Sequence, residues 1–183
     1  MKSMTDVLQV TGGRNGYGAK LANIFSTEFI VETADGKNSY KQRFRKNMTK
    51  KEEPVIKACK DRYTRITFYP ELARFGMQHF DSDIVALFTK RAYDIAGCNG
   101  DVKVYINGER IMIKSFQKYM DMYLKDSPQL PRIFEKVNDR WEVGITLSEG
   151  VFTQVSFVNS ICTYKGGKHV GMILLKQLLL ISV

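Results

Sequence analysis

The residues best suited to chemistry lie in a glycine-rich turn near the start of the chain. Residues 11–26 read Thr-Gly-Gly-Arg-Asn-Gly-Tyr-Gly-Ala-Lys-Leu-Ala-Asn-Ile-Phe-Ser. Gly13, Gly16 and Gly18 allow the backbone to adopt positive φ angles and to approach a ligand without a Cβ atom in the way. The apolar pattern that follows predicts a helix, whose first N–H groups and positive dipole end would face the turn beside Lys20. The sequence therefore predicts a phosphate-binding loop.

Two common phosphate-binding motifs do not fit this loop. A Walker A motif requires Gly-x-x-x-x-Gly-Lys-Ser/Thr; Gly13 and Gly18 have that interval, but Lys20 comes one residue late and Leu21 stands where a hydroxyl is needed. The glycine order is also not Gly-x-Gly-x-x-Gly, and no apolar strand precedes it, which disfavours a Rossmann-type cofactor protein. A turn without a ligand stays the alternative, although the adjoining lysine and helix favour phosphate.

Residues 12–21, Gly-Gly-Arg-Asn-Gly-Tyr-Gly-Ala-Lys-Leu, resemble the ATP lid and phosphate-binding motif of eukaryotic-type type IIA DNA topoisomerases. The ATPase of that family belongs to the GHKL group, with gyrase, Hsp90 and MutL. Four further blocks resemble the same proteins in the same order: Tyr-Thr-Arg-Ile-Thr-Phe-Tyr-Pro (63–70), Asp-Ile-Val-Ala-Leu-Phe-Thr-Lys-Arg-Ala-Tyr-Asp-Ile-Ala-Gly (83–97), Tyr-Met-Asp-Met-Tyr-Leu-Lys-Asp (119–126) and Ser-Phe-Val-Asn-Ser-Ile-Cys-Thr-Tyr-Lys-Gly-Gly-Lys-His-Val (156–170). The resemblance covers the chain from about residue 10 to residue 170.

The resemblance implies an α+β fold. Residues 1–128 are expected to form the C-terminal part of a GHKL (Bergerat) ATPase sandwich, and residues 129–183 the beginning of the transducer domain. The implied activity is that of an ATP-hydrolysing type II DNA topoisomerase, an isomerase that passes one duplex through a transient double-strand break in another while ATP closes a dimeric gate. ATP, Mg²⁺ and DNA are the implied cofactors and partners, a homodimer is the implied assembly and the nucleus is the implied location.

Carried over residue by residue, the resemblance places one short segment along the triphosphate of ATP: Gly13, Arg14, Asn15, Gly16, Tyr17, Gly18, Ala19 and Lys20. Backbone amides of this segment would donate to phosphate oxygens. The Lys20 ammonium would add charge, and the Asn15 side chain would contact ribose or phosphate. Thr64 corresponds to a family threonine that helps to hold adenine. For Tyr17, a ligand contact and a packing role under the lid both stay open.

The hydrolytic groups of the family have no counterpart in this sequence. In the family, a helix upstream of the glycine loop supplies the glutamate general base, a magnesium-binding asparagine and an adenine-binding aspartate. The lysine that reaches the γ-phosphate and the tyrosine that cleaves DNA would follow residue 183. Because hydrolysis needs a base, a metal and charge stabilisation together, we expect no catalytic residue and no activity in this chain alone. We interpret both ends, including the atypical apolar tail 171–183, as those of a truncated or misread gene product.

The positive charge of the chain is unevenly distributed. The formal net charge is +9, and residues 37–65 contain eleven Lys and Arg against Glu52, Glu53 and Asp61, a surplus of eight. Such a segment is either a solvated basic face or a binding surface for a polyanion. The second interpretation gives the alternative function, a non-enzymatic nucleic-acid-binding remnant in which the glycine loop is idle.

Three cysteines lack the C-x-x-C spacing of a zinc or redox site: Cys59, Cys98 and Cys162. Their odd number and wide separation predict buried free thiols. Neither His79 nor His169 has a partner at metal-ligand spacing, so no metal site is predicted. The apolar tail 171–183 is shorter than the roughly 20 residues that span a bilayer, and Lys176 interrupts it, so no membrane partner is expected.

Local patterns in the first half of the chain predict a helix, three strands and a second helix. Residues 29–33 and 40–44 alternate as strands around the turn Asp35-Gly36, and residues 63–69 form a third strand. Residues 82–96 are predicted as a helix closed by Gly97. Its expected buried face consists of Ile84, Leu87, Phe88, the stem of Arg91, and Ile95.

Local patterns in the second half predict hairpins joined by a short helix. The turn Asn107-Gly108 predicts a hairpin of residues 102–106 and 111–113. Ser115 begins a helix with an expected buried side of Phe116, Tyr119, Met120, Tyr123 and Leu124. Residues 126–131 are predicted as a linker. The alternating segments 141–147 and 151–157 are predicted to pair. For Gly166-Gly167, the local pattern indicates only a flexible turn, and the resemblance implies a loop between sheet and helix.

Overall fold

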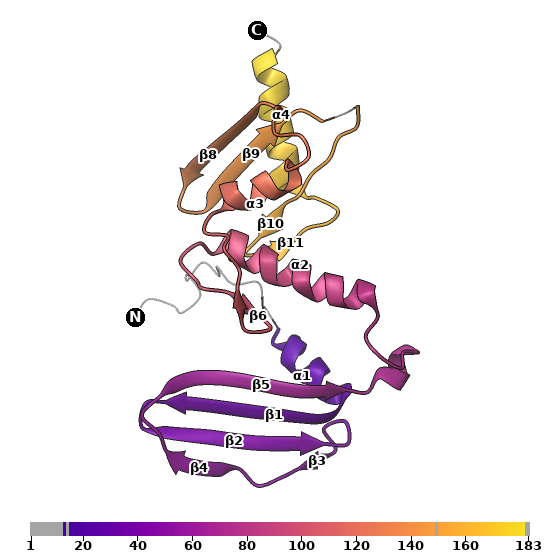
Figure 1. Cartoon of the computed structure of the whole chain (residues 1–183), viewed down its shortest axis with the longest axis vertical. Helices are drawn as coiled ribbons and strands as arrows, with labels where there is room; N and C mark the ends of the chain where they lie inside the picture. Colours follow the sequence, from indigo (N-terminus) through magenta and orange to yellow (C-terminus); the bar gives the residue numbers. More distant parts are fainter. Residues whose placement is uncertain (1–12, 14, 149, 182–183) are drawn as a thin grey trace, which may run out of the picture. The chain divides into compact units, whose positions relative to one another are not determined.

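The computed structural model describes residues 13, 15–148 and 150–181. They form two compact units, Gly13–Asp81 and a second unit that contains residues 82–181 (Figure 1). Both units mix helices and sheet, which confirms the predicted α+β class. The predicted boundary at residue 128 divides two domains of the family. The division of this chain into compact units does not test that boundary, so it stays a prediction. Among the described residues, no helix is long and apolar enough to cross a membrane.

The first unit is an antiparallel sheet preceded by one helix. Its elements are α1 (Tyr17–Ile24), β1 (Ser26–Asp35), β2 (Asn38–Arg45), β3 (Lys50–Lys51), β4 (Val55–Ala58), β5 (Arg62–Pro70) and the 3₁₀ helix η1 (Leu72–Phe75). The strand order is β3-β2-β1-β5, and β4 also pairs with β2. The central strand β1 therefore has both of its edges paired, by β2 and by β5 (Figure 1).

The turn between β1 and β2 forms as its sequence predicts. The Asp35 carboxylate accepts hydrogen bonds from the backbone N–H groups of Lys37 and Asn38, both at 2.8 Å. Gly36 lies at φ 92°, a conformation that L side chains disfavour. These N–H donors hold the pKa of Asp35 below its usual value, with the contribution of Asn38 first. The predicted hairpin is confirmed, with longer strands than the pattern indicated.

The two faces of this sheet differ in chemistry, because side chains alternate along each strand. One face gathers Phe29 of β1 with its partners Phe44 and Phe68. Phe29 is buried, and its ring centroid lies 6.3 Å from that of Phe68. Ile66 and Phe68 on this face remain about half exposed. The opposite face carries the charged residues of β1 and β2.

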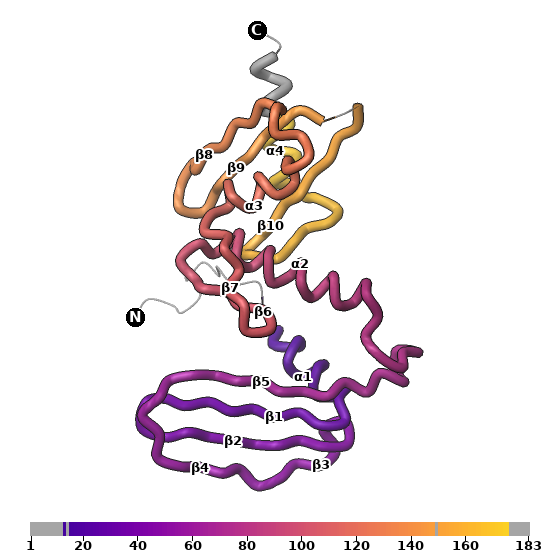
Figure 2. Tube along the Cα trace, in the orientation of Figure 1, coloured from indigo at the N-terminus to yellow at the C-terminus, as the bar shows by residue number. Residues whose placement is uncertain are grey.

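The second unit combines three helices with three two-stranded sheets. Its elements are α2 (Ser82–Cys98), β6 (Tyr105–Ile106), β7 (Glu109–Arg110), α3 (Phe116–Tyr123), β8 (Arg132–Asn138), β9 (Trp141–Thr146), β10 (Phe157–Val158), β11 (Ile161–Cys162) and α4 (Lys168–Ile181). The strands pair as β6-β7, β8-β9 and β10-β11. Strands β8 and β9 run side by side in Figure 2.

Helix α2 forms where predicted, but a different face of it is buried. Leu87, Phe88 and Ile95 are 40% exposed or more, whereas Asp94, Ala96 and Gly97 are buried. Gly97 does not close the helix, which runs to Cys98. A Cβ atom at Gly97 would lie 2.6 Å from the Tyr119 ring, so the glycine is needed for close packing against α3. The predicted buried face and the predicted end of α2 are therefore wrong.

Local capping and turn signals in this unit are confirmed. The Ser115 hydroxyl accepts a hydrogen bond from the Lys118 N–H and caps α3. Asn107 and Gly108 have φ angles of 50° and 84° and join β6 to β7, although these strands are only two residues long. On the expected buried side of α3, Tyr119 and Leu124 are buried. Tyr123 is 52% exposed, so the prediction that Tyr123 is buried is wrong.

Strand β9 forms as predicted, but it pairs with a different partner. Its register runs from Arg132↔Thr146 to Asn138↔Trp141 with β8, a strand that the sequence analysis did not identify. Of the predicted partner 151–157, residues 151–156 are not in a strand, and Phe157 belongs to β10. Pairing of the segments 141–147 and 151–157 is therefore wrong.

The core of the second unit is built around α3. The Phe116 ring lies 6.4 Å from Phe134 of β8 and 6.1 Å from Phe157 of β10. The Tyr119 ring meets Phe157 edge-on at 5.7 Å. Gly144 of β9 leaves room for the Met120 thioether, which a Cβ atom there would overlap. Aromatic contacts of one short helix therefore hold two sheets in this unit.

Candidate functional site

The glycine loop leads directly into the N-terminus of α1. Gly16 is the N-cap residue and lies at φ 66°, in the left-handed region. No side chain caps the helix there, because glycine has none to offer. The first backbone N–H groups of α1 consequently have no partner within the helix and point toward the loop. This geometry is the one that binds an anion at a helix N-terminus.

The glycines of the loop are not explained by packing. A Cβ atom built on Gly13, Gly16 or Gly18 would meet no atom of the described residues within 4 Å. Gly16 is needed for its positive φ angle, but Gly18 is the second residue of α1. Glycine is less favourable than alanine in a helix, by about 1 kcal/mol in the interior and by less in the first turn. Open space around a costly glycine fits a ligand that approaches the backbone there.

The remaining predicted site residues are exposed. Asn15, Ala19 and Lys20 are all exposed, and the Tyr17 side chain is 63% exposed. Tyr17 therefore packs against little of the described chain, which fits a ligand contact better than a core role. Arg14 lies outside the described residues. The predicted cradle thus consists of backbone amides and exposed side chains at the N-terminal end of α1, and its role in binding stays a prediction.

Thr64 belongs to the middle of the same unit. It lies on β5 opposite Thr33 of β1, and the two hydroxyl oxygens are 3.2 Å apart. Both hydroxyls are on the sheet face that carries Phe29 and Phe68. The predicted adenine contact of Thr64 stays a prediction.

A buried carboxylate that the sequence reading missed joins α2 to α3. Asp94 is fully buried, and its two carboxylate oxygens accept hydrogen bonds from the Lys90 ammonium at 2.9 and 3.0 Å. The Tyr119 hydroxyl donates to Asp94 at 2.6 Å and lies 2.8 Å from the Tyr123 hydroxyl. Arg91 adds a contact at 3.4 Å. The carboxylate is therefore fully used in holding two helices together.

This network changes the acidity of its neighbours. Burial raises the pKa of Tyr119, and the hydrogen bond to Asp94 adds to this, so the phenol stays protonated as a donor. For Lys90, burial is the largest single influence and lowers the pKa. The hydrogen bond to Asp94 and the coulombic attraction of Tyr123, Asp94 and Cys162 together outweigh it, so the net pKa lies above the usual value. Both shifts keep the network in its hydrogen-bonded protonation state at neutral pH.

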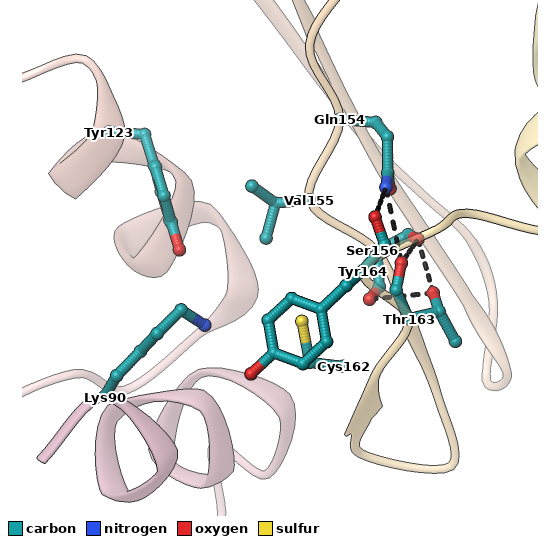
Figure 3. A pocket seen from close by; sticks show the side chains of 8 residues that line it. All are labelled: Lys90, Tyr123, Gln154, Val155, Ser156, Cys162, Thr163 and Tyr164. Carbon is teal, nitrogen blue, oxygen red and sulfur yellow. Dashed lines mark hydrogen bonds between the residues drawn. The ribbon is translucent and has the colours of Figure 1, made fainter. Parts of the chain in front are cut away.

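A small pocket opens beside this network (Figure 3). It has a volume of about 150 Å³ and is lined by Lys90, Tyr123, Gln154, Val155, Ser156, Cys162, Thr163 and Tyr164. The Gln154 amide donates to the Tyr164 carbonyl at 3.0 Å, and the Lys90 ammonium lies 5.7 Å from the Tyr164 ring centroid. Pockets for cofactor-sized ligands span about 300–1,000 Å³. The volume is too small for a nucleotide, so this pocket does not compete with the glycine loop.

The cysteines are free, as predicted, but half-buried rather than buried. Burial raises the pKa of the Cys98 thiol to about 11, and the Asp94 carboxylate contributes in the same direction. Among the described residues, no group of His, Cys, Asp and Glu is arranged to hold a metal ion. Cys98 is therefore a weakly acidic thiol beside a structural network.

Cys98 should react slowly with alkylating agents at pH 8. A rise of about two pKa units lowers the thiolate fraction about a hundredfold, which the greater nucleophilicity of the more basic thiolate offsets in part. We expect iodoacetamide to modify Cys98 at least about tenfold more slowly in the folded chain than in the urea-unfolded chain, with a rate that rises up to about pH 11. Peptide mapping by mass spectrometry gives both rates, and equal rates at pH 8 would contradict the raised pKa.

Comparison with known proteins places these features in context. The chain is 60% identical over 168 residues to a probable DNA topoisomerase 2 of Dictyostelium discoideum; the match covers 88% of this chain and 11% of the relative. The ATPase region of Saccharomyces cerevisiae topoisomerase II superposes with a TM-score of 0.89 at 47% identity, over 95% of this chain and 47% of that one. The ATPase and transducer domains of DNA topoisomerase II from Balamuthia mandrillaris superpose at 0.83 and 45% identity, over 91% and 43%. No protein-family model matches the chain.

Proposed function

We propose, because the chain belongs to the eukaryotic DNA topoisomerase II family, that residues 13–20 bind the triphosphate of ATP in the ATPase region of such an enzyme. The fold is that of the GHKL-type ATPase region. The chain spans about a tenth of the length of the Dictyostelium relative. The reaction of the whole protein, ATP-gated passage of one DNA duplex through a break in another, is therefore part of the proposal, as are a homodimer and a nuclear location.

The observation that carries the proposal is the open backbone at the start of α1. Gly16 adopts the left-handed conformation that frees the first N–H groups, and Gly18 keeps the helix surface bare above them. Polyphosphate oxygens are acceptors that such N–H groups and the positive end of the helix dipole stabilise. Lys20, exposed on the same helix, adds a full positive charge.

Bound ATP would supply the γ-phosphoryl group whose hydrolysis resets the gate. The residues of this chain bind and orient the triphosphate. We assign no general base and no magnesium ligand to them, so Mg²⁺ would be held through the nucleotide. On this basis the 183-residue chain alone should bind ATP and show no turnover above background.

A calorimetric titration tests this function. We expect a non-hydrolysable ATP analogue with Mg²⁺ to bind the chain saturably, and Gly16→Val and Lys20→Ala to weaken or abolish binding. Valine at Gly16 cannot adopt φ 66° without strain, which displaces the amides. Gly108→Val, at φ 84° in the second unit, is the matched control and should leave the affinity unchanged. An unmodified chain that binds no analogue would overturn the proposal.

The nucleic-acid-binding remnant with an idle loop is not favoured. The relatives are DNA topoisomerases, and the structural matches are ATPase regions.

A further inference from the structure

We propose that the charged face of the sheet in residues 26–70 binds the phosphate backbone of duplex DNA. This surface, called the cationic face below, consists of Glu28, Ile30, Glu32, Ala34, Ser39, Lys41, Arg43, Arg45, Lys50, Glu52, Lys57, Tyr63, Arg65, Thr67 and Tyr69. The proposal rests on the proposed function, since it names a surface for the DNA on which the family acts. It assigns a role to the basic segment 37–65, which takes no part in the proposed binding of ATP.

Strand register places the basic residues on one side of the sheet. Lys41, Arg43 and Arg45 alternate along β2, and opposite them on β1 lie Glu32, Ile30 and Glu28. Directly opposed residues of antiparallel strands share a face. The same rule brings in Arg65, opposite Glu32, then Lys50, opposite Arg45, and Lys57, opposite Ser39.

The acidic residues of the face are recessed beneath the basic ones. Glu32 is bound by Lys41 at 3.2 Å and by Arg65 at 3.8 Å, and its side chain is 17% exposed, against 47% for Lys41 and 65% for Arg65. Glu28 is bound in the same way by Arg43 and Arg45. A ligand that approaches the sheet therefore meets cations first.

The ion pairs leave positive charge and hydrogen-bond donors unused. The face carries six cations against three carboxylates, Glu28, Glu32 and Glu52, a surplus of three charges. Glu28 and Glu32 are each shared by two cations, and Glu52 pairs with Arg45. An arginine has five N–H donors. The pairs also hold the cationic side chains in place, so less side-chain freedom is lost when a phosphate binds. Buried Ile30 and Ala34 lie under the aliphatic stems of these side chains.

The shape and chemistry of the face fit a duplex better than a single strand. Lys41, Arg43 and Arg45 stand about 7 Å apart along β2, which gives a row of charges about 14 Å long. Single-stranded nucleic acid is held by aromatic rings on which bases stack. The row along β2 consists of charged residues instead. The two tyrosines of the face, Tyr63 and Tyr69, lie on the outer strand β5, and the Arg65 guanidinium lies over the Tyr63 ring at 5.4 Å. Phosphate contacts of this kind do not depend on DNA sequence.

The test uses the 183-residue chain and a fluorescent 30-base-pair duplex, with anisotropy measured from 50 to 200 mM salt. If about four phosphates are contacted, the affinity falls about a hundredfold over this range. Lys50→Gln/Lys57→Gln leaves both glutamate ion-pair clusters intact, so the fold is preserved. Lys41→Gln/Arg65→Gln removes the two cations of Glu32. Each pair should lower the slope of log K against log salt by about 1.8.

The matched control removes the same charge from the other unit. Lys103→Gln/Lys114→Gln changes two exposed residues outside the sheet and should leave the salt slope within about 0.5 of the unmodified chain. Three results would each overturn the inference: weak duplex binding at 50 mM salt, an equal decrease of the salt slope in the control variant, or binding to anionic lipid vesicles but not to DNA. ATP-analogue titrations of the same variants separate the two proposals. A variant that loses DNA binding but keeps its nucleotide affinity supports DNA binding by the cationic face. An unmodified chain that binds DNA but no nucleotide overturns only the proposed function of the glycine loop.

Discussion

Asp94→Ala is expected to lower the free energy of unfolding of the second unit by about 3 kcal/mol. The carboxylate is fully buried and accepts hydrogen bonds from Tyr119 at 2.6 Å and from Lys90 at 2.9 Å. Its removal leaves the Tyr119 hydroxyl without its acceptor in a desolvated position, which costs about 1–3 kcal/mol. Loss of the ion pairs adds less, because Lys90 and Arg91 are more than a third exposed and can turn to solvent.

Urea unfolding followed by tryptophan fluorescence measures this effect. Trp141 is the single tryptophan and lies on β9, in the same unit as Asp94, so its emission reports on that unit. Asp83→Ala is the control, an exposed aspartate in the first turn of the same helix, and should cost below about 1 kcal/mol. Tyr119→Phe should cost about 1–2 kcal/mol, and the double variant less than the sum. Equal effects of Asp94→Ala and Asp83→Ala would contradict a structural role for this carboxylate.

The Asp94 network also shows where sequence reasoning ends. The periodicity of residues 82–96 predicts a helix, but it does not say which stripe meets a neighbour. The stripe that is buried contains Asp94 and Gly97, because the Tyr119 ring needs the space over Gly97 and its hydroxyl needs an acceptor. Both requirements are set by Tyr119 of α3, which lies more than 20 residues after Asp94 and Gly97 in the sequence. A local pattern therefore predicts the element and misses its contact face.

Turns and caps were predictable because their causes are local. Asp35-Gly36, Asn107-Gly108 and Ser115 form the predicted hairpins and helix cap with φ angles and hydrogen bonds between near neighbours. The partner of β9 was not predictable, because the alternation in residues 141–147 fits any antiparallel neighbour. In the structure this neighbour is β8. Likewise, a count of charges in residues 37–65 could not show that glutamates of β1 lie beneath several of them.

For the glycine loop, the sequence predicted the helix that follows it and glycines that allow positive φ angles. Gly16 is the N-cap at φ 66°, and α1 follows at Tyr17. The structure adds that the space around the three glycines is open to at least 4 Å among the described residues. Close packing is therefore not the reason for Gly18 among the described residues. Addition of one methyl group can then test whether a ligand is the reason.

Gly18→Ala is expected to stabilise the fold and to weaken nucleotide binding at once. An added Cβ atom meets no atom of the described residues within 4 Å. Alanine in a helix is more favourable than glycine by up to about 1 kcal/mol, and in the first turn we expect about half of that. The same methyl group would stand where phosphate oxygens approach the backbone. If binding free energy falls by about 1.4 kcal/mol or more, the affinity for the nucleotide falls at least about tenfold. Thermal unfolding and calorimetric titration of an ATP analogue give the two quantities.

The opposite signs are what make this variant decisive. Gly171→Ala is the matched control, because Gly171 is also a helical glycine with open space around its Cβ position, in α4 of the second unit. It should raise stability by a similar amount and leave the nucleotide affinity unchanged. If Gly18→Ala stabilises the chain and binds the analogue as tightly as the unmodified protein, the bare helix surface at the start of α1 does not face a phosphate. The glycine would then belong to the turn alone, and the triphosphate would have to bind through other residues.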